Sequence, residues 1–156
     1  MKLSSNFWLY EFTRSQKATR FGIDNQPDVK ALEELRALVA NVLQPLREMV
    51  KRPINISSGY RSPELNEMIG GSKKSQHMKG QAADIECFGL SNAALAKMIF
   101  DHFQYDQLIL EFHVPEEGPN SGWIHVSHRR SGDNRQKALR ATRNGDGKTV
   151  YEQITF

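Results

Sequence analysis

The sequence predicts an α+β fold in a single domain, with helices packed on a small, mostly antiparallel sheet. Three observations lead to this prediction. The chain has 156 residues, of which 38% are hydrophobic and 25% charged, as is typical of one globular domain. Helical patterns come early in the chain and strand patterns come late, an order that favours α+β. No repeat, low-complexity tract or linker interrupts the sequence, so we expect residues 1–156 to form one domain.

The N-terminal part is expected to be helical. Thr13 to Gln16 has the capping-box spacing for a short helix that Gly22 ends. From Pro27 to Lys51 apolar residues recur at helical spacing and predict the main core helix. Pro45 should kink or split this helix, because proline lacks the N–H that would bond to Asn41. An N-terminal flap is expected from the aromatic residues that precede these helices, namely Phe7, Trp8, Tyr10 and Phe12.

A strand and a short helix follow. Residues 54–57 read as a strand and residues 59–61 as a turn. Ser62 is a typical N-cap before Pro63, and Gly70 is suited to end the helix that begins there. Arg61 is therefore held at a strand-to-helix junction, where a rigid scaffold often positions binding residues.

The second half contains one helix and several strands. Ser91 is expected to cap a helix that runs to Phe103. Strand patterns then follow at residues 107–112, 123–127, 136–142 and 148–154. Asn144-Gly145-Asp146-Gly147 lies between the last two and predicts a hairpin.

Charge and hydropathy limit the partners. The net charge is +3, and the excess is concentrated in a late basic run that only Asp133 opposes: Arg129, Arg130, Arg135, Lys137, Arg140 and Arg143. This run either contacts an anionic wall polymer or nucleic acid, or is a solvated strand pair. The N-terminus lacks a long apolar segment, and no apolar run approaches the ~20 residues of a membrane span. We therefore expect synthesis in the cytoplasm without a signal peptide, and no membrane insertion.

Two histidines and one aspartate form a candidate metal site. His77 follows a loop of small and polar residues, and Asp84 lies in a short predicted strand, residues 83–86. Alternation along residues 123–127 lets His125 point away from the core. Two imidazoles and a carboxylate suit zinc and leave a fourth position open, as catalytic zinc sites do. A lone cysteine, Cys87, excludes both a disulfide framework and a cysteine-rich zinc site.

Spacing alone does not separate such a site from coincidence, but the surrounding residues form a known pattern. The block S-x-H-x-x-G-x-A-x-D runs from Ser75 to Asp84, and W-x-H ends at His125. Together they resemble the metallopeptidase family of zinc D-Ala-D-Ala carboxypeptidases and phage peptidoglycan endopeptidases, most closely its short branch in phages and prophages. Ser58 to Pro63 and Phe7 to Pro27 support the resemblance, which extends to about Ser127. It implies a fold like that of hedgehog domains and D-Ala-D-Ala peptidases.

The resemblance also implies roles for individual residues. It makes His77, Asp84 and His125 the zinc ligands. Arg61 matches the arginine that the family places near the scissile bond or the substrate carboxylate, and the planar guanidinium suits either anion. The alternative is a structural arginine paired with Glu64 or Glu67.

Ser75 and Gln76 precede the first zinc histidine. Their side chains are expected to hydrogen-bond either the substrate or the metal ligands. Both residues could equally serve as turn formers.

The general base departs from the family pattern. Better-known members often carry Asp or Glu three residues before the second zinc histidine, and this chain has Gly122 there. Glu111 is the candidate, because pairing directly opposite His125 in a hairpin would put both on one face. A one-residue slip would turn Glu111 away, toward solvent. Glu116 and Glu117 in the intervening loop are the substitutes.

The sequence thus predicts a monomeric zinc metallopeptidase that hydrolyses peptide bonds in peptidoglycan stem peptides. As a phage or prophage enzyme it would act on the cell wall after release or as part of a virion. One alternative is a non-catalytic zinc domain of hedgehog-like fold, acting as a binding or virion structural module. A nucleic-acid-binding module using the late basic run is the other, but it leaves the histidines and aspartate unexplained.

Overall fold

A computed structural model describes all residues, 1–156. The helices are α1 (Leu9–Thr13), α2 (Gln16–Phe21), α3 (Val29–Leu38), a π-helical segment (Val39–Leu43), α4 (Gln44–Val50), α5 (Pro63–Met68) and α6 (Asn92–His102). Two short 3-10 helices span Gln76–Lys79 and Pro115–Glu117. The strands are β1 (Asn55–Ser58), β2 (Ala82–Glu86), β3 (Gln107–Glu111), β4 (Trp123–Ser127), β5 (Lys137–Arg143) and β6 (Thr149–Gln153).

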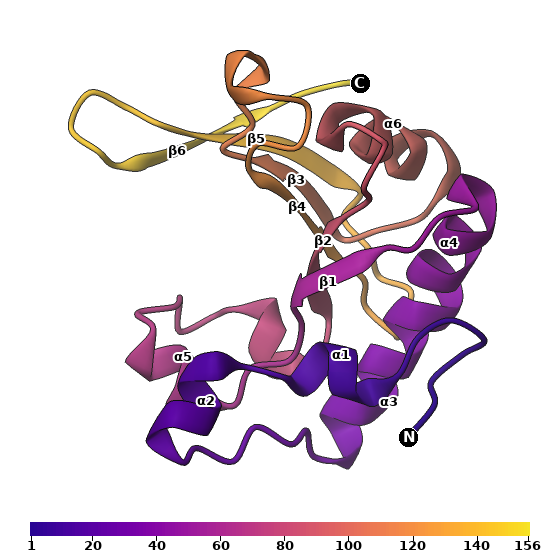
Figure 1. The fold of residues 1–156 in the computed structure, drawn as a ribbon, viewed down its shortest axis with the longest axis vertical. Helices are drawn as coiled ribbons and strands as arrows, with labels where there is room; N and C mark the ends of the chain where they lie inside the picture. The colour runs from indigo at the N-terminus through magenta and orange to yellow at the C-terminus, as the bar shows by residue number, and fades with distance from the viewer.

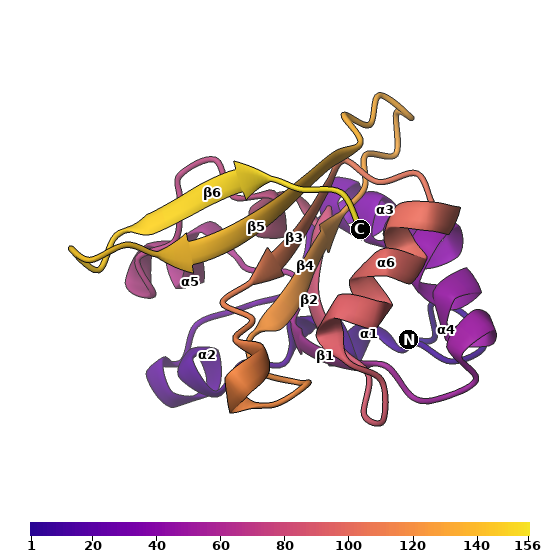
Figure 2. The same cartoon turned by 90° about the horizontal axis from the view of Figure 1, so that it is seen from above.

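All six strands form one sheet, in the order β1-β2-β4-β3-β5-β6 (Figure 1). Every neighbouring pair is antiparallel except β3 and β5, which are parallel. The predicted α+β class and mostly antiparallel sheet are therefore confirmed. Helices α3, α4 and α6 cover one face of the sheet, whereas α2 and α5 lie on the other side (Figure 2).

Alternation along the strands separates the core from the candidate site. Ile124 and Val126 of β4 are fully buried in the main hydrophobic cluster, together with Leu108 and Leu110 of β3. Trp123 and His125 point to the opposite face, as predicted. One face of the sheet thus supplies the core, and the other is left to polar side chains.

The long helix predicted from Pro27 to Lys51 is interrupted close to Pro45, as expected. A π-helical segment, Val39–Leu43, separates α3 from α4, and Pro45 lies in the first turn of α4. Without an N–H on Pro45 the regular helical hydrogen bond to Asn41 is lost, and a local π segment is a common way to absorb such an irregularity. Leu38, Val42 and Leu46 remain fully buried along the split helix.

The N-terminal predictions need two corrections. The short helix is capped by Ser15, whose hydroxyl accepts from the Ala18 N–H at 3.2 Å, and not by Thr13, which ends α1 and is buried. Gly22 ends it in the left-handed conformation as expected, at φ +65°. The aromatic flap is only half right, because Phe7 and Phe12 join the core while Trp8 and Tyr10 are exposed.

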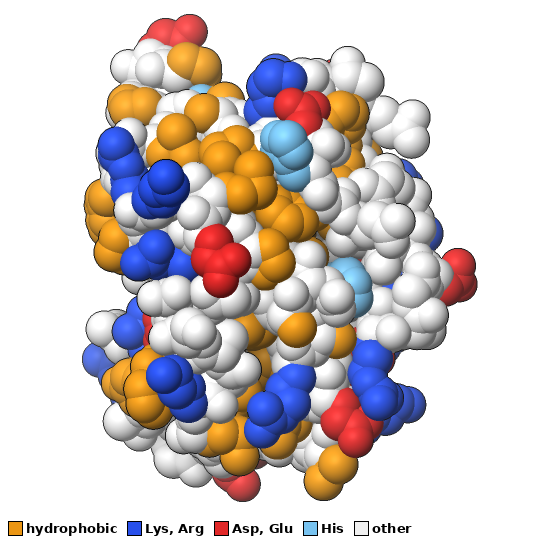
Figure 3. Space-filling view, turned by 90° about the vertical axis from the view of Figure 1, so that its right-hand side faces the viewer, with side chains coloured by type: hydrophobic (Ala, Val, Ile, Leu, Met, Phe, Trp, Pro, Cys, Tyr) orange, Lys and Arg blue, Asp and Glu red, His pale blue; other side chains and the backbone are white.

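Much of the late basic run is paired with acidic side chains. The guanidinium groups of Arg129 and Arg135 contact the Asp106 carboxylate at 3.3 and 2.7 Å, and that of Arg130 contacts Glu33 at 3.2 Å. On the face shown in Figure 3, positive and negative side chains are scattered among apolar and uncharged atoms. The last two strands form the expected hairpin, which extends beyond the rest of the molecule (Figure 1). No helix has the length and apolar character to cross a membrane.

Candidate metal and active site

His77 is held rigidly at the start of the site. It lies on the 3-10 helix Gln76–Lys79, with only 3% of its surface exposed. Its Nδ1 is 2.7 Å from the Gly59 carbonyl oxygen, which can only accept, so Nδ1 carries the proton. This leaves the Nε2 lone pair directed to the Asp84 side chain, 3.4 Å from Oδ1. Histidines that bind metals are commonly oriented by such a carbonyl.

Asp84 and His125 face each other across two strands. They are direct partners in the β2–β4 ladder, and His125 Nδ1 is 3.1 Å from Asp84 Oδ1. One donor atom from each of His77, Asp84 and His125 lies within 4.8 Å of the others. Two imidazole nitrogens and a carboxylate oxygen at this separation fit one zinc ion with an open fourth position.

The charge states of this cluster also suit a metal. Burial alone would raise the pKa of the Asp84 carboxyl, but the two histidines beside it, with His125 Nδ1 at hydrogen-bond distance, outweigh burial and hold this pKa well below its usual range. Burial lowers the pKa of His77, which is therefore neutral at pH 7. Burial lowers the pKa of His125, but the hydrogen bond and negative charge of Asp84, together with the charge of Glu111, outweigh it and raise this pKa, so a metal competes with a proton at this ring.

Arg61 lies beside the cluster without a carboxylate of its own. Its backbone N–H donates to the His77 carbonyl oxygen at 3.1 Å, and its guanidinium donates to Asn66 Oδ1 at 3.0 Å. The alternative pairing with Glu64 or Glu67 is absent. Its buried Nε has no hydrogen-bond partner. The guanidinium therefore retains donors for an anionic ligand.

Glu111 lies on the same face as the cluster, but its register differs from the prediction. Glu111 pairs with Trp123, and the partner of His125 is Ile109. Because the offset is two residues and the side-chain period is also two, Glu111 still points to the site face. It lines one cavity of about 490 Å³ together with Arg61, His77, Asp84 and His125. Burial and the nearby Asp84 charge raise the pKa of Glu111, whereas His125, Trp123 and Arg61 lower it.

Gly122 shows why the usual carboxylate position is empty in this chain. The residue has φ +69°, and an added Cβ would collide with the main chain of Glu111 and Phe112. Phe112 is itself left-handed, at φ +53°, so the chain is tightly folded where β3 ends. The substitutes Glu116 and Glu117 are exposed and do not line the cavity. Glu111 is the only glutamate that does.

Ser75 and Gln76 line the cavity but are engaged within the protein. The Ser75 hydroxyl accepts from the His77 N–H at 3.2 Å and so caps the 3-10 helix. The Gln76 amide donates to Asp106 Oδ2 at 2.9 Å and to Gln81 Oε1 at 3.2 Å. In this structure both side chains fix the loop that carries His77, and a contact with substrate stays a prediction.

Sequence reasoning missed several residues of the cavity wall. Lys74, Arg135 and Tyr151 all line it. Tyr151 comes from β6 and reaches the site because it pairs with Ala141, which in turn pairs with Glu111. The turn residues Asn144 to Gly147 predicted the hairpin, but no motif linked it to the site, and only its position in the sheet reveals this role.

Together, an α+β fold and an open cluster of two histidines and one aspartate beside a half-buried glutamate define a candidate metallohydrolase. The chain belongs to the peptidase M15 family, whose family model matches residues 5–127. It is also 38% identical over 61 residues to the zinc D-Ala-D-Ala carboxypeptidase of Streptomyces albus G. That match covers 38% of this chain and 24% of the relative. Family, relative and donor set together indicate zinc as the metal of the site.

Proposed function

We propose that this chain is a zinc peptidase that hydrolyses peptide bonds in peptidoglycan stem peptides, as a carboxypeptidase or an endopeptidase. The observation that supports the proposal most directly is the shared cavity. Glu111 and Arg61 face the same space as His77, Asp84 and His125. Hydrolysis of a peptide bond requires a base, a group that stabilises negative charge and an electrophile, and this cavity has a candidate for each.

In the proposed reaction the chain's residues hold the metal, move the proton and orient the peptide. His77, Asp84 and His125 would hold zinc, which when bound polarises the scissile carbonyl and lowers the pKa of water. Glu111 takes a proton from the attacking water and returns it to the leaving amine. Its raised pKa suits both steps, since a base that must also act as an acid works best when its pKa is moved toward neutrality. Arg61 holds a substrate carboxylate or the developing oxyanion.

The proposal extends to the setting of the enzyme. A short M15 domain of this kind is suited to wall lysis or remodelling by a phage or prophage, acting as a monomer. It would reach peptidoglycan after release from the cell or as part of a virion. Its fold would be shared with hedgehog domains.

A non-catalytic zinc domain is the second candidate, and Gly122 is the observation that favours it. A chain without the usual carboxylate could retain the metal only for structure or binding. Glu111 argues against this candidate, because a half-buried glutamate in the cavity supplies the missing type of group.

Purified peptidoglycan separates the two candidates. The zinc-loaded chain should release new amino termini, a chelator should stop the release, and added zinc should restore it. His77→Ala should be inactive, and mass spectrometry of defined muropeptides identifies the bond that is cut. A folded, zinc-loaded chain that releases nothing from any of these substrates would establish the non-catalytic domain instead.

A further inference from the structure

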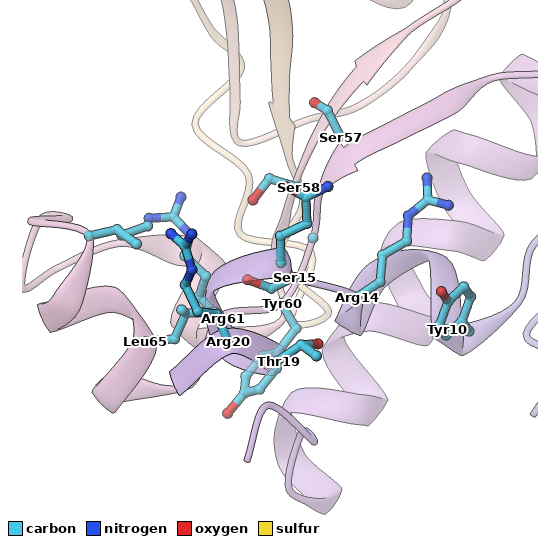
Figure 4. A pocket seen from close by; sticks show the side chains of 13 residues that line it. Tyr10, Arg14, Ser15, Thr19, Arg20, Ser57, Ser58, Tyr60, Arg61 and Leu65 are labelled. Atoms are coloured by element: carbon cyan, nitrogen blue, oxygen red, sulfur yellow. The ribbon is translucent and has the colours of Figure 1, made fainter. Parts of the chain in front are cut away.

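A second and larger cavity lies next to the candidate active site. It has a volume of about 890 Å³ and opens between the N-terminal helices and the junction of β1 with α5 (Figure 4). This volume is within the range of about 300–1,000 Å³ that is usual for ligand sites. Arg61 lines both cavities, so a ligand that passes this residue can occupy both.

The charged residues of this cavity all have the same sign. Three arginines, Arg14, Arg20 and Arg61, are the only lining residues that are charged at neutral pH, and no aspartate or glutamate lines the cavity. None of the three forms an ion pair elsewhere in the protein. The cavity is therefore complementary to a negatively charged ligand.

Two of the arginines are placed in ways that leave donors free. Arg14 is anchored by one nitrogen, which donates to the Ile56 carbonyl oxygen at 3.1 Å and to Asn55 Oδ1 at 3.4 Å. Arg20 makes no hydrogen bond through its side chain. In Figure 4 the side chains of Arg20 and Arg61 lie on one side of the cavity and that of Arg14 on the other. A guanidinium with free N–H groups binds a carboxylate in a bidentate manner.

Uncharged polar groups and apolar side chains complete the wall. Ser58 offers a hydroxyl group, and the hydroxyls of Ser15 and Ser57 keep part of their hydrogen-bonding capacity beside their bonds to the Ala18 N–H and the Asp84 carbonyl oxygen. Leu65 of α5 and Ile69, its C-cap, offer apolar contacts. Such a mixture suits a peptide, whose amides need hydrogen bonds and whose side chains are partly apolar. One part of the wall comes from residues between Tyr10 and Arg20, a segment to which the proposed chemistry gives no role.

We propose that this cavity binds an acidic segment of the substrate peptide, and that Arg20 and Arg14 recognise a free carboxylate on it. In a stem peptide the α-carboxylate of a γ-linked glutamate has the required chemistry. The chain then discriminates between peptides in which this group is a carboxylate and those in which it is an amide. This inference rests on the proposed function, because it assumes that the reacting peptide continues past Arg61.

Direct binding tests the inference without relying on turnover. The zinc-loaded Glu111→Gln variant serves as the common background, and calorimetry measures its affinity for two synthetic stem peptides that differ only in a glutamate carboxylate or its amide. The carboxylate peptide should bind about three- to tenfold more tightly, as expected for exposed, partly bidentate pairs. The preference should weaken as salt is raised.

Matched charge removals at the N-terminal helices locate the contact. Arg20→Gln should abolish most of the preference, and Arg14→Gln should reduce it. Lys17→Gln removes the same charge from the same helix, but Lys17 does not line the cavity, so the preference should remain. Equal affinity for the two peptides, or a preference unchanged in both arginine variants, would overturn the inference. A chain that discriminates in binding yet releases nothing from peptidoglycan would instead refute the proposed function.

Discussion

Gly122 packs directly against the main chain of Glu111, and this contact explains how a peptidase site can lack its usual carboxylate. An added Cβ at Gly122 would overlap the Glu111 carbonyl oxygen and the carbonyl group of Phe112. A carboxylate at Gly122 and the observed path of the chain at Glu111 are therefore mutually exclusive. The acidic side chain reaches the cavity from β3 instead.

Gly122→Ala should destabilise the fold by about 2–4 kcal/mol, from a left-handed backbone and from overpacking. Gly132→Ala is the matched control, because Gly132 also has positive φ, +83°, but nothing within 4 Å of an added Cβ. It should cost only about 1–2 kcal/mol. Urea unfolding measures the loss in free energy of unfolding for each variant. Equal losses would show that an added Cβ at Gly122 meets no steric overlap with the main chain.

Glu111→Gln should lower kcat/KM by about 10²- to 10⁴-fold, the usual contribution of general acid–base catalysis. The amide keeps the size of the side chain but cannot take a proton, so zinc content should be unchanged. Glu117→Gln is the control, since Glu117 is exposed and outside the cavity, and its activity should match that of the unmodified chain. Activity retained by Glu111→Gln but lost by Glu117→Gln would transfer the role of base to the loop.

Arg61→Lys should lower kcat/KM by about ten- to a hundredfold, because lysine keeps the charge but loses the planar set of donors. Zinc-dependent stabilisation should persist, since Arg61 is not among the grouped metal donors. Arg36→Lys makes the same substitution at an exposed arginine of α3 and should leave kcat/KM unchanged. If Arg61→Lys were fully active, the positive charge alone would account for the role of Arg61.

Zinc should stabilise the fold through His77 and His125. At a free zinc concentration 100 times the dissociation constant, binding contributes about 2.7 kcal/mol, which appears as a higher Tm that a chelator reverses. His77→Ala and His125→Ala should lose this shift, whereas His102→Ala, at the exposed end of α6, should keep it. A full shift in His77→Ala would remove His77 from the ligand set.

The sequence sufficed for the parts of the site that depend on local pattern. Alternation along β4 predicted that His125 faces away from Ile124 and Val126, and Pro45 predicted the break in the long helix. The loop motif from Ser75 to Asp84 predicted that its histidine and aspartate lie together. Each of these follows from a few neighbouring residues.

The rest depends on contacts between distant residues. The β3–β4 register could not be read, because left-handed residues at Phe112 and Gly122 set where pairing begins. Ser15 and Thr13 are both good caps, and only the end of α1 at Thr13 decides between them. Tyr151 and the cavity lined by arginines arise from elements brought together by the sheet and the N-terminal helices.

Asp106 holds together the His77 loop and the late basic segment, and its removal should alter stability in a pH-dependent way. Its side chain is fully buried and accepts hydrogen bonds from Arg135 and Gln76, while Arg129 lies 3.3 Å away. Burial would raise the pKa of Asp106, but these partners outweigh it and the pKa is lowered. Asp106→Asn should therefore cost about 2–4 kcal/mol at pH 7, since it leaves two arginines without their anion.

The sign of the pH dependence follows from the lowered pKa. A carboxyl group whose pKa is lower in the folded than in the unfolded protein stabilises the fold above the unfolded pKa of 3.8, and this contribution is lost as the pH falls through the folded value. The gap in unfolding free energy between the metal-free parent chain and Asp106→Asn should be constant near neutrality and narrow below about pH 4. Urea unfolding across this range measures it, with Asp133→Asn, an exposed aspartate of the same segment, as the control. A gap that stays constant to low pH would mean that Asp106 acts through its shape and not through its charge.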